Sequence, residues 1–89
     1  MSSKIFYVYM VRCSDNTLYT GYSDNVLRRV KTHNRGKGAK YTRCRLPVHL
    51  VYVESFSSKS GAMSREWYIK HRLSRKDKEA LIRSGLNEV

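Results

Sequence analysis

Hydrophobic and polar positions divide the chain into strand-like runs and segments with helical spacing. Residues 4–12 (KIFYVYMVR) and 18–22 (LYTGY) are rich in the aromatic and β-branched side chains that favour strands. The turn-forming residues 14–16 (SDN) lie between them, so the pattern predicts a β-hairpin. Residues 48–56 (VHLVYVESF) follow Pro47 and predict a third strand, whose even and odd positions face opposite sides of the sheet.

Helical spacing of apolar residues predicts the remaining elements. The first helix is expected over residues 25–34, with Ser23 or Asp24 as its N-cap. Its apolar stripe consists of Val26, Leu27 and Val30. The last helix begins with a segment close to a capping box at residues 74–77 and runs to about Arg83.

A longer helix is expected over residues 59–72, and it contains an acid among apolar positions. Its apolar face consists of Ala62, Ile69 and Leu73, broadened by Met63 and Trp67. Glu66 lies within that face, where a carboxylate is costly unless it is paired or bound to a metal. Two interpretations of the Glu66 carboxylate are equally favoured: it forms a salt bridge to Arg29 or a hydrogen bond to a tyrosine, or it binds a cation.

The element order β-β-α-β-α-α predicts an α+β fold of the α/β-sandwich kind. We expect a three-stranded antiparallel sheet flanked by about three helices, in a single domain over residues 1–89. The second strand ends at Gly21, where glycine permits either an unusual backbone conformation or the close approach of another group.

The charge of the chain predicts a polyanionic partner. Its 18 Lys and Arg against 7 Asp and Glu give a formal net charge of +11, which favours nucleic acid first and an anionic membrane surface second. No acid occurs between Asp24 and Glu54. Within that window the candidate nucleic-acid-binding residues are Arg28, Arg35, Lys37, Lys40, Tyr41, Arg43 and Arg45. A solvated basic loop is the alternative interpretation of this segment.

The cysteines and the hydropathy predict a cytoplasmic protein without a membrane segment. Cys13 and Cys44 are expected to be free thiols, because no long apolar run indicates export or insertion. The usual Cys/His pair spacings of zinc sites do not occur.

On the first helix, Arg29 and His33 are four residues apart and therefore share one flank. Together with the hairpin tyrosines, they give the chain a resemblance to the GIY-YIG nuclease domain superfamily. Residues 7–9 (YVY) stand where that family has Gly-Ile-Tyr, and residues 19–21 (YTG) stand where it has Tyr-Ile-Gly. Residues 38–52 and 65–70 are similar to segments of its small single-domain bacterial subfamily, typified by YazA and YhbQ (UPF0213).

The resemblance implies a metal-dependent endonuclease that hydrolyses phosphodiester bonds of nucleic acid, DNA more than RNA, in DNA repair or processing. It implies one divalent ion, Mg²⁺ or Mn²⁺, bound by Glu66. Tyr9 would take a proton from the attacking water, with Tyr19 as its alternative or its hydrogen-bond partner. Arg29 would brace the phosphate, and His33 would orient Tyr9 or relay its proton. Arg29 and the metal would lower the pKa of the phenol that serves as the base.

Other residues receive supporting roles or none. Tyr7, which replaces the first motif glycine, and Gly21 are expected to be structural at the site. Asn87 is the candidate for an asparagine that some nucleases of the family use, and we do not assign it that role. We expect a monomer or weak dimer, with a protein partner that supplies specificity. The alternative functions are a non-catalytic nucleic-acid-binding module that uses the basic loop at residues 34–45, and an adaptor for a protein partner.

Overall fold

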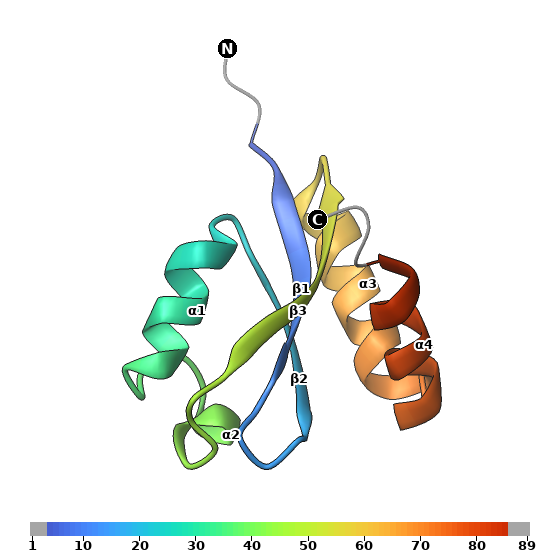
Figure 1. Ribbon diagram of the computed structural model, residues 1–89. Helices are drawn as coiled ribbons and strands as arrows, with labels where there is room; N and C mark the ends of the chain where they lie inside the picture. The colour runs from blue at the N-terminus through green and yellow to red at the C-terminus, as the bar shows by residue number, and fades with distance from the viewer. Residues whose placement is uncertain (1–3, 86–89) are drawn as a thin grey trace.

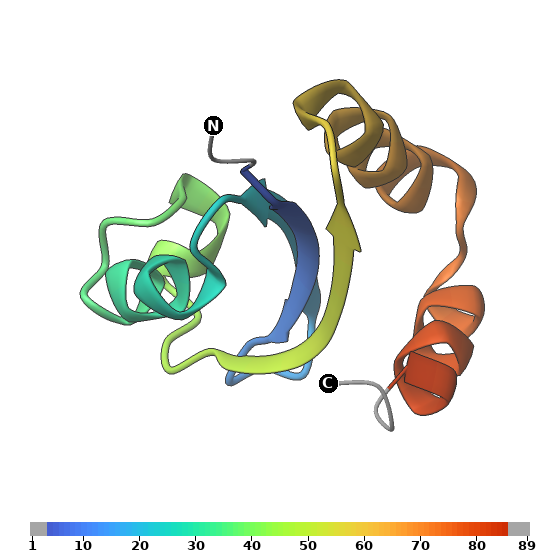
Figure 2. The same cartoon turned by 90° about the horizontal axis from the view of Figure 1, so that it is seen from above.

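A three-stranded antiparallel sheet lies between two layers of helices in the computed structural model, which describes residues 4–85 (Figures 1 and 2). The elements are β1 (Phe6–Arg12), β2 (Leu18–Ser23), α1 (Val26–Asn34), α2 (Lys40–Arg43), β3 (His49–Phe56), α3 (Lys59–Arg72) and α4 (Arg75–Gly85). The strand order β2-β1-β3 places the first strand in the centre. The predicted hairpin, fold class and element order are confirmed, and the single helical turn α2 within the basic loop was not predicted.

Alternation along β1 divides the core between the faces of the sheet. Val8 and Met10 pack with Ala62, Ile69 and Ile82 on the side of α3 and α4. Tyr9 and Val11 belong to a separate cluster on the side of α1, together with Val26, Val48 and Cys13. The tyrosines of the first motif therefore face α1, whereas Glu66 belongs to a helix on the opposite face (Figure 2).

A β-bulge in β3 makes the expected strict alternation of this strand wrong. Met10 pairs with Tyr52 and Val11 pairs with Leu50, so Val51 is an extra residue in the ladder. As a result, Val51 and its neighbour Tyr52 both pack on the α3 and α4 side. Leu50 and Val53 pack on the side of α1.

Several helix details differ from the expectations. The N-cap of α1 is Asn25, whose side-chain oxygen accepts from the Arg28 backbone N–H at 3.1 Å, and not Ser23 or Asp24. Leu27 is 71% exposed and does not contribute to the apolar stripe of α1. Met63 and Trp67 on α3 are also largely exposed. These three residues fall outside the width of the helix face that the sheet covers.

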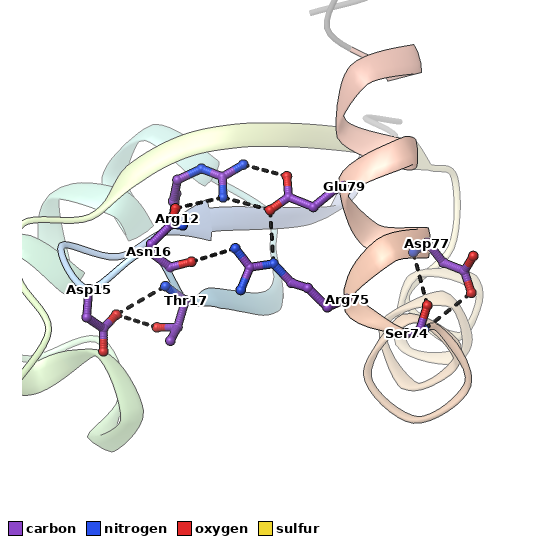
Figure 3. Close-up of polar contacts among 8 residues, drawn as sticks. All are labelled: Arg12, Asp15, Asn16, Thr17, Ser74, Arg75, Asp77 and Glu79. Carbon is purple, nitrogen blue, oxygen red and sulfur yellow. Dashed lines mark hydrogen bonds and ion pairs between the residues drawn. The ribbon is translucent and has the colours of Figure 1, made fainter.

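A polar cluster attaches α4 to the β1–β2 hairpin (Figure 3). Arg12 donates to both carboxylate oxygens of Glu79, at 2.9 and 2.8 Å, and Arg75 donates to the same carboxylate at 2.9 Å. Hydrogen bonds from Arg12 lower the pKa of Glu79 to about 2. At the start of α4, the Ser74 hydroxyl and the Asp77 carboxylate accept each other's backbone N–H, so the predicted capping box is confirmed.

The cysteines and the helices agree with two further expectations from the sequence. Cys13 is buried, Cys44 is exposed, and both are free thiols, as predicted. Within residues 4–85, each helix is too short or too polar to cross a lipid bilayer.

Candidate active site

A chain of buried hydrogen bonds links the hairpin to the basic loop through His33. The Tyr9 hydroxyl lies 2.9 Å from Nε2 of His33, and Nδ1 of the same ring lies 2.9 Å from the Thr42 hydroxyl oxygen. The Thr42 hydroxyl donates to the Ala39 carbonyl oxygen at 3.2 Å, so its oxygen is left to accept from Nδ1–H. Nε2 then carries a lone pair and accepts the Tyr9 O–H. Thr42, which connects these groups, was not among the predicted site residues.

Both ionisable members of this chain are neutral near pH 7. Tyr9 and His33 have no exposed surface. The pKa of Tyr9 is raised to about 12, mainly by burial. Arg29 lowers this pKa, as expected, whereas Tyr19 and Glu66 make smaller contributions that raise it. Burial, followed by the positive charge of Arg29, lowers the pKa of His33. The expectation that Arg29 brings Tyr9 close to a base at neutral pH is therefore outweighed by burial.

Tyr19 is the partly exposed phenol of the cluster and is held between aromatic and cationic groups. Its ring lies edge-on to His33, with 5.2 Å between centroids, and stacks with Tyr41 at 5.9 Å. The Lys70 ammonium lies 5.5 Å from the centre of the Tyr19 ring. The β1–β2 ladder pairs Val11 with Tyr19, which places this ring on the same side of the sheet as Tyr9.

Glu66 is connected to the cluster by Lys70. Its carboxylate lies 3.3 Å from the Lys70 ammonium, and the Glu66 side chain is 19% exposed. The partner of the acid is thus neither Arg29 nor a tyrosine. Because Lys70 lies four residues after Glu66, the spacing itself was a signal for this ion pair. The Lys70 ammonium also lies over the Tyr19 ring, so this cation joins the acid on α3 to the tyrosine at the edge of the cluster.

Arg29 is anchored at one nitrogen and has another without a partner. Its Nη2 donates to the Gly38 carbonyl oxygen at 3.2 Å, whereas its Nε is buried and lacks a hydrogen-bond partner among residues 4–85. Arg29 also lines a hollow of about 390 Å³ together with Lys4, Lys59 and Asp24, and Lys4 pairs with Asp24 at 3.0 Å. An anion in this hollow would meet the positive charges of Arg29 and Lys59, whereas the charge of Lys4 is offset by Asp24.

Two glycines allow close approach to the buried chain of hydrogen bonds. A Cβ atom at Gly21 would lie 2.6 Å from the Tyr9 hydroxyl oxygen, and one at Gly38 would lie 2.3 Å from Nδ1 of His33. Close approach is therefore the reason for glycine at position 21. Gly38 has the same relation to His33, and its role was not predicted.

The basic loop presents most of its predicted cations to solvent. The exposed basic residues are Arg28, Arg35, Lys37, Lys40 and Arg43. Arg45 differs, because it pairs with Asp15 at 3.0 Å and its guanidinium carbon lies 4.1 Å from the centre of the Tyr41 ring. Arg45 therefore stabilises the loop against the hairpin. Tyr41, which is 39% exposed, is held between Arg45 and Tyr19. Tyr7 is partly buried in the core on the side of α1.

Residues 5–79 match the model of the GIY-YIG catalytic domain. The chain belongs to this family. It is 52% identical over 88 residues to a UPF0213 protein of Bacillus licheniformis, covering 99% of this chain and 90% of that protein. It is 49% identical over 87 residues to the UPF0213 protein YazA of Bacillus subtilis, covering 98% and 87%. The solution NMR structure of the UPF0213 protein BH0048 from Bacillus halodurans shares 50% identity, with a TM-score of 0.58 over 90% of this chain and 84% of that one.

The two short GIY-YIG motifs lie opposite each other in the hairpin. Tyr9 pairs with Gly21, and Val11 pairs with Tyr19, in the antiparallel register of β1 and β2. In the part of the chain that the structure describes, no cluster of three or more His, Cys, Asp or Glu could hold a metal ion. The donor set at the site fits Mg²⁺ or Mn²⁺ bound by the Glu66 carboxylate, because such ions often keep several waters and use one or two carboxylates plus substrate oxygens. Asn87 lies outside the described residues.

Proposed function

We propose that this chain is a metal-dependent endonuclease that hydrolyses phosphodiester bonds of nucleic acid, with DNA favoured over RNA and a role in DNA repair or processing. The hydrogen bond between Tyr9 and His33 is the observation that carries the proposal. It joins the first hairpin motif to the helix that carries Arg29 and His33, and membership of the GIY-YIG family makes both candidates for catalysis. Lys70, which pairs with Glu66 and lies over the Tyr19 ring, links the acid to the same cluster and supports one shared site.

In the proposed reaction, Tyr9 acts as a proton relay. With a pKa of about 12, it is protonated at neutral pH and is not a free phenolate. Tyr9 accepts a proton from the attacking water while its own proton passes to Nε2 of His33, which the Thr42 acceptor leaves unprotonated. Water must reach the phenol oxygen for this step, and because Tyr9 has no exposed surface, the groups that cover it would have to move when substrate binds. Tyr19, which is partly exposed, would hydrogen-bond to the water or the phosphate.

Arg29 and Glu66 would act on the scissile phosphate and on the leaving oxygen. A divalent ion on Glu66 would supply charge stabilisation for the phosphate and the leaving oxygen. The Arg29 guanidinium, anchored on Gly38 with its Nε unpartnered, would donate to the scissile phosphate. In the adjoining hollow, Lys59 would favour entry of the strand that carries this phosphate, whereas Lys4 is paired with Asp24.

A non-catalytic nucleic-acid-binding module is the second candidate. It is favoured by the complete burial of Tyr9 and by the Lys70 partner of Glu66, since both groups are satisfied without substrate or metal. In that case the exposed cations of the basic loop at residues 34–45 would bind nucleic acid, and the tyrosines would serve as core.

Cleavage assays on branched, single-stranded and duplex DNA, and on matched RNA, with Mg²⁺ or Mn²⁺ decide between these functions. Glu66→Gln and Tyr9→Phe should each reduce cleavage by roughly 100-fold or more, because each removes a group needed in the transition state. The matched controls are Glu54→Gln, an acid that is also paired (with Arg65 at 2.8 Å) but lies on β3, and Tyr68→Phe, whose ring is 45% exposed. Both controls should cleave normally. Salt-sensitive binding without cleavage of any substrate would leave the binding module as the function.

A further inference from the structure

The outer flank of α3 exposes a large aromatic side chain next to the candidate active site. Trp67 is 52% exposed and Met63 is 45% exposed, so neither belongs to the core. At 100° per residue, Met63, Glu66, Lys70 and Trp67 fall on adjoining positions around the helix. Because Lys70 pairs with Glu66 and lies over the Tyr19 ring, the indole lies on the flank of α3 that borders these site residues.

Basic groups surround this indole. The Arg72 guanidinium carbon lies 5.5 Å from the centre of the Trp67 ring, and the His71 ring lies 4.8 Å from it with an interplanar angle of 36°. An apolar partner would have to desolvate these polar groups, which costs free energy. A polyanion with flat apolar rings would instead use both features, since its phosphates meet the cations and its bases meet the indole.

We propose that Trp67 is a stacking subsite for an unpaired base of the nucleic-acid strand whose neighbouring phosphate enters the site. The subsite rests on the proposed function in one respect, namely that the strand at Glu66 is nucleic acid. Arg72 contacts a phosphate of the stacked nucleotide or of its neighbour. Duplex bases have their faces covered by their neighbours, so this subsite selects single-stranded or locally unpaired substrates over continuous duplex.

Fluorescence provides a direct test, because Trp67 is the single tryptophan of the chain. The probes are an oligothymidine of about 12 nucleotides, a size that suits small single-strand binding sites, and a blunt-ended DNA duplex of similar length formed from two complementary strands. Both are titrated into the protein in EDTA, which prevents metal-dependent cleavage. We expect the oligothymidine to quench the emission of Trp67 and to protect it from acrylamide, and the duplex to do so less at equal occupancy.

Variants separate stacking from charge. Trp67→Leu should weaken oligothymidine binding by roughly 5- to 100-fold, the range for loss of one aromatic stacking contact, while Trp67→Phe stays within about threefold of the wild type. The salt dependence of binding should keep its slope in Trp67→Leu, because no charge is removed, and should become shallower by about 0.7 in Arg72→Gln. Tyr68→Leu is the matched control. Tyr68 lies on the same helix, is 45% exposed, and has the Arg65 guanidinium carbon 5.6 Å from the centre of its ring. It lines a different groove, towards Leu81 of α4, so the Tyr68→Leu variant should bind oligothymidine like the wild type.

The proposal is overturned if Trp67→Leu binds oligothymidine as tightly as Tyr68→Leu does. It is also overturned if sedimentation shows a dimer that Trp67→Leu dissociates while nucleic-acid affinity is unchanged, because the occupant of the flank is then a second copy of the chain. The proposed function fails separately. Absence of cleavage together with quenching and loss of affinity in Trp67→Leu would refute the nuclease and support the stacking subsite.

Discussion

Replacement of Thr42 by valine tests the hydrogen-bond chain that fixes the tautomer of His33. Thr42 is fully buried, and its hydroxyl accepts from His33 and donates to the Ala39 carbonyl oxygen. Valine has nearly the same shape, so the substitution removes the hydroxyl without creating a large cavity. The Nδ1–H of His33 then loses its acceptor in a buried position.

The expected cost follows from that unsatisfied donor. A buried polar group that loses its partner destabilises a protein by about 1–3 kcal/mol. For a domain of this size each kcal/mol lowers Tm by about 4–8 °C, so Thr42→Val should melt roughly 5–20 °C below the wild type. The proton of the imidazole can escape the cost by moving to Nε2, which would reverse the hydrogen bond to Tyr9 and remove the acceptor of the proposed relay.

The assay combines thermal unfolding with nitrogen NMR of the imidazole, which reports which ring nitrogen carries the proton. Thr42→Ser keeps the hydroxyl and should retain the wild-type tautomer. Thr32→Val is the second control. It removes a hydroxyl that donates to the Arg28 carbonyl oxygen at 3.0 Å in an exposed position, and it should change Tm little. If Thr42→Val melts like Thr32→Val and keeps the Nδ1–H tautomer, the inferred direction of the hydrogen bonds is wrong.

The remaining predictions concern burial around the same cluster. Gly38→Ala places a Cβ 2.3 Å from Nδ1 of His33 and should destabilise the protein by about 1–3 kcal/mol in urea unfolding; wild-type stability would refute the close contact. The pKa of His33 in the folded state lies below its unfolded value of about 6.5. The free energy of unfolding should therefore be at its full value above about pH 6.5 and should fall as the pH drops through the folded pKa. In His33→Gln the free energy of unfolding should depend less on pH over this range. The pKa values of Tyr9 and Tyr52 rise from 10.0 to about 12, so each should contribute about 3 kcal/mol of stability that is lost between pH 10 and 12. Tyr9→Phe and Tyr52→Phe should each reduce that alkaline loss, and an unchanged profile would show that burial does not raise the pKa of the replaced tyrosine.

Local signals in the sequence were sufficient to predict the elements other than α2 and most members of the candidate site. The hairpin follows from two β-rich runs around a turn, and α4 follows from its capping box, because both depend on neighbouring residues. Arg29 and His33 share a helix flank for the same reason. The ladder of β1 and β2 then brings Tyr9 and Tyr19 to the side of the sheet that α1 covers.

Features that depend on partners distant in the chain were not predictable in the same way. The bulge at Val51 is defined only by the pairing of β3 with β1. Leu27 is apolar and has helical spacing, but the width of the covered face leaves it exposed. Thr42 and Gly38 lie in a glycine-containing segment that the sequence indicated to be a flexible loop. Both residues contact His33 only because this loop folds back onto the imidazole.

The structure weakens the sequence argument for a metal ion at Glu66. An acid within an apolar stripe implies a counter-charge, and Lys70 supplies one without a metal. An i,i+4 ion pair of this kind stabilises a protein by about 0.3–0.5 kcal/mol, which corresponds to roughly a twofold change in an equilibrium constant. Competition from Lys70 would therefore reduce the affinity of Glu66 for a divalent ion only slightly. Because Lys70 already balances the charge of Glu66, the burial of this acid is not evidence for a metal ion. The proposal of a metal ion at Glu66 depends on the carboxylate as a ligand type and on membership of the GIY-YIG family.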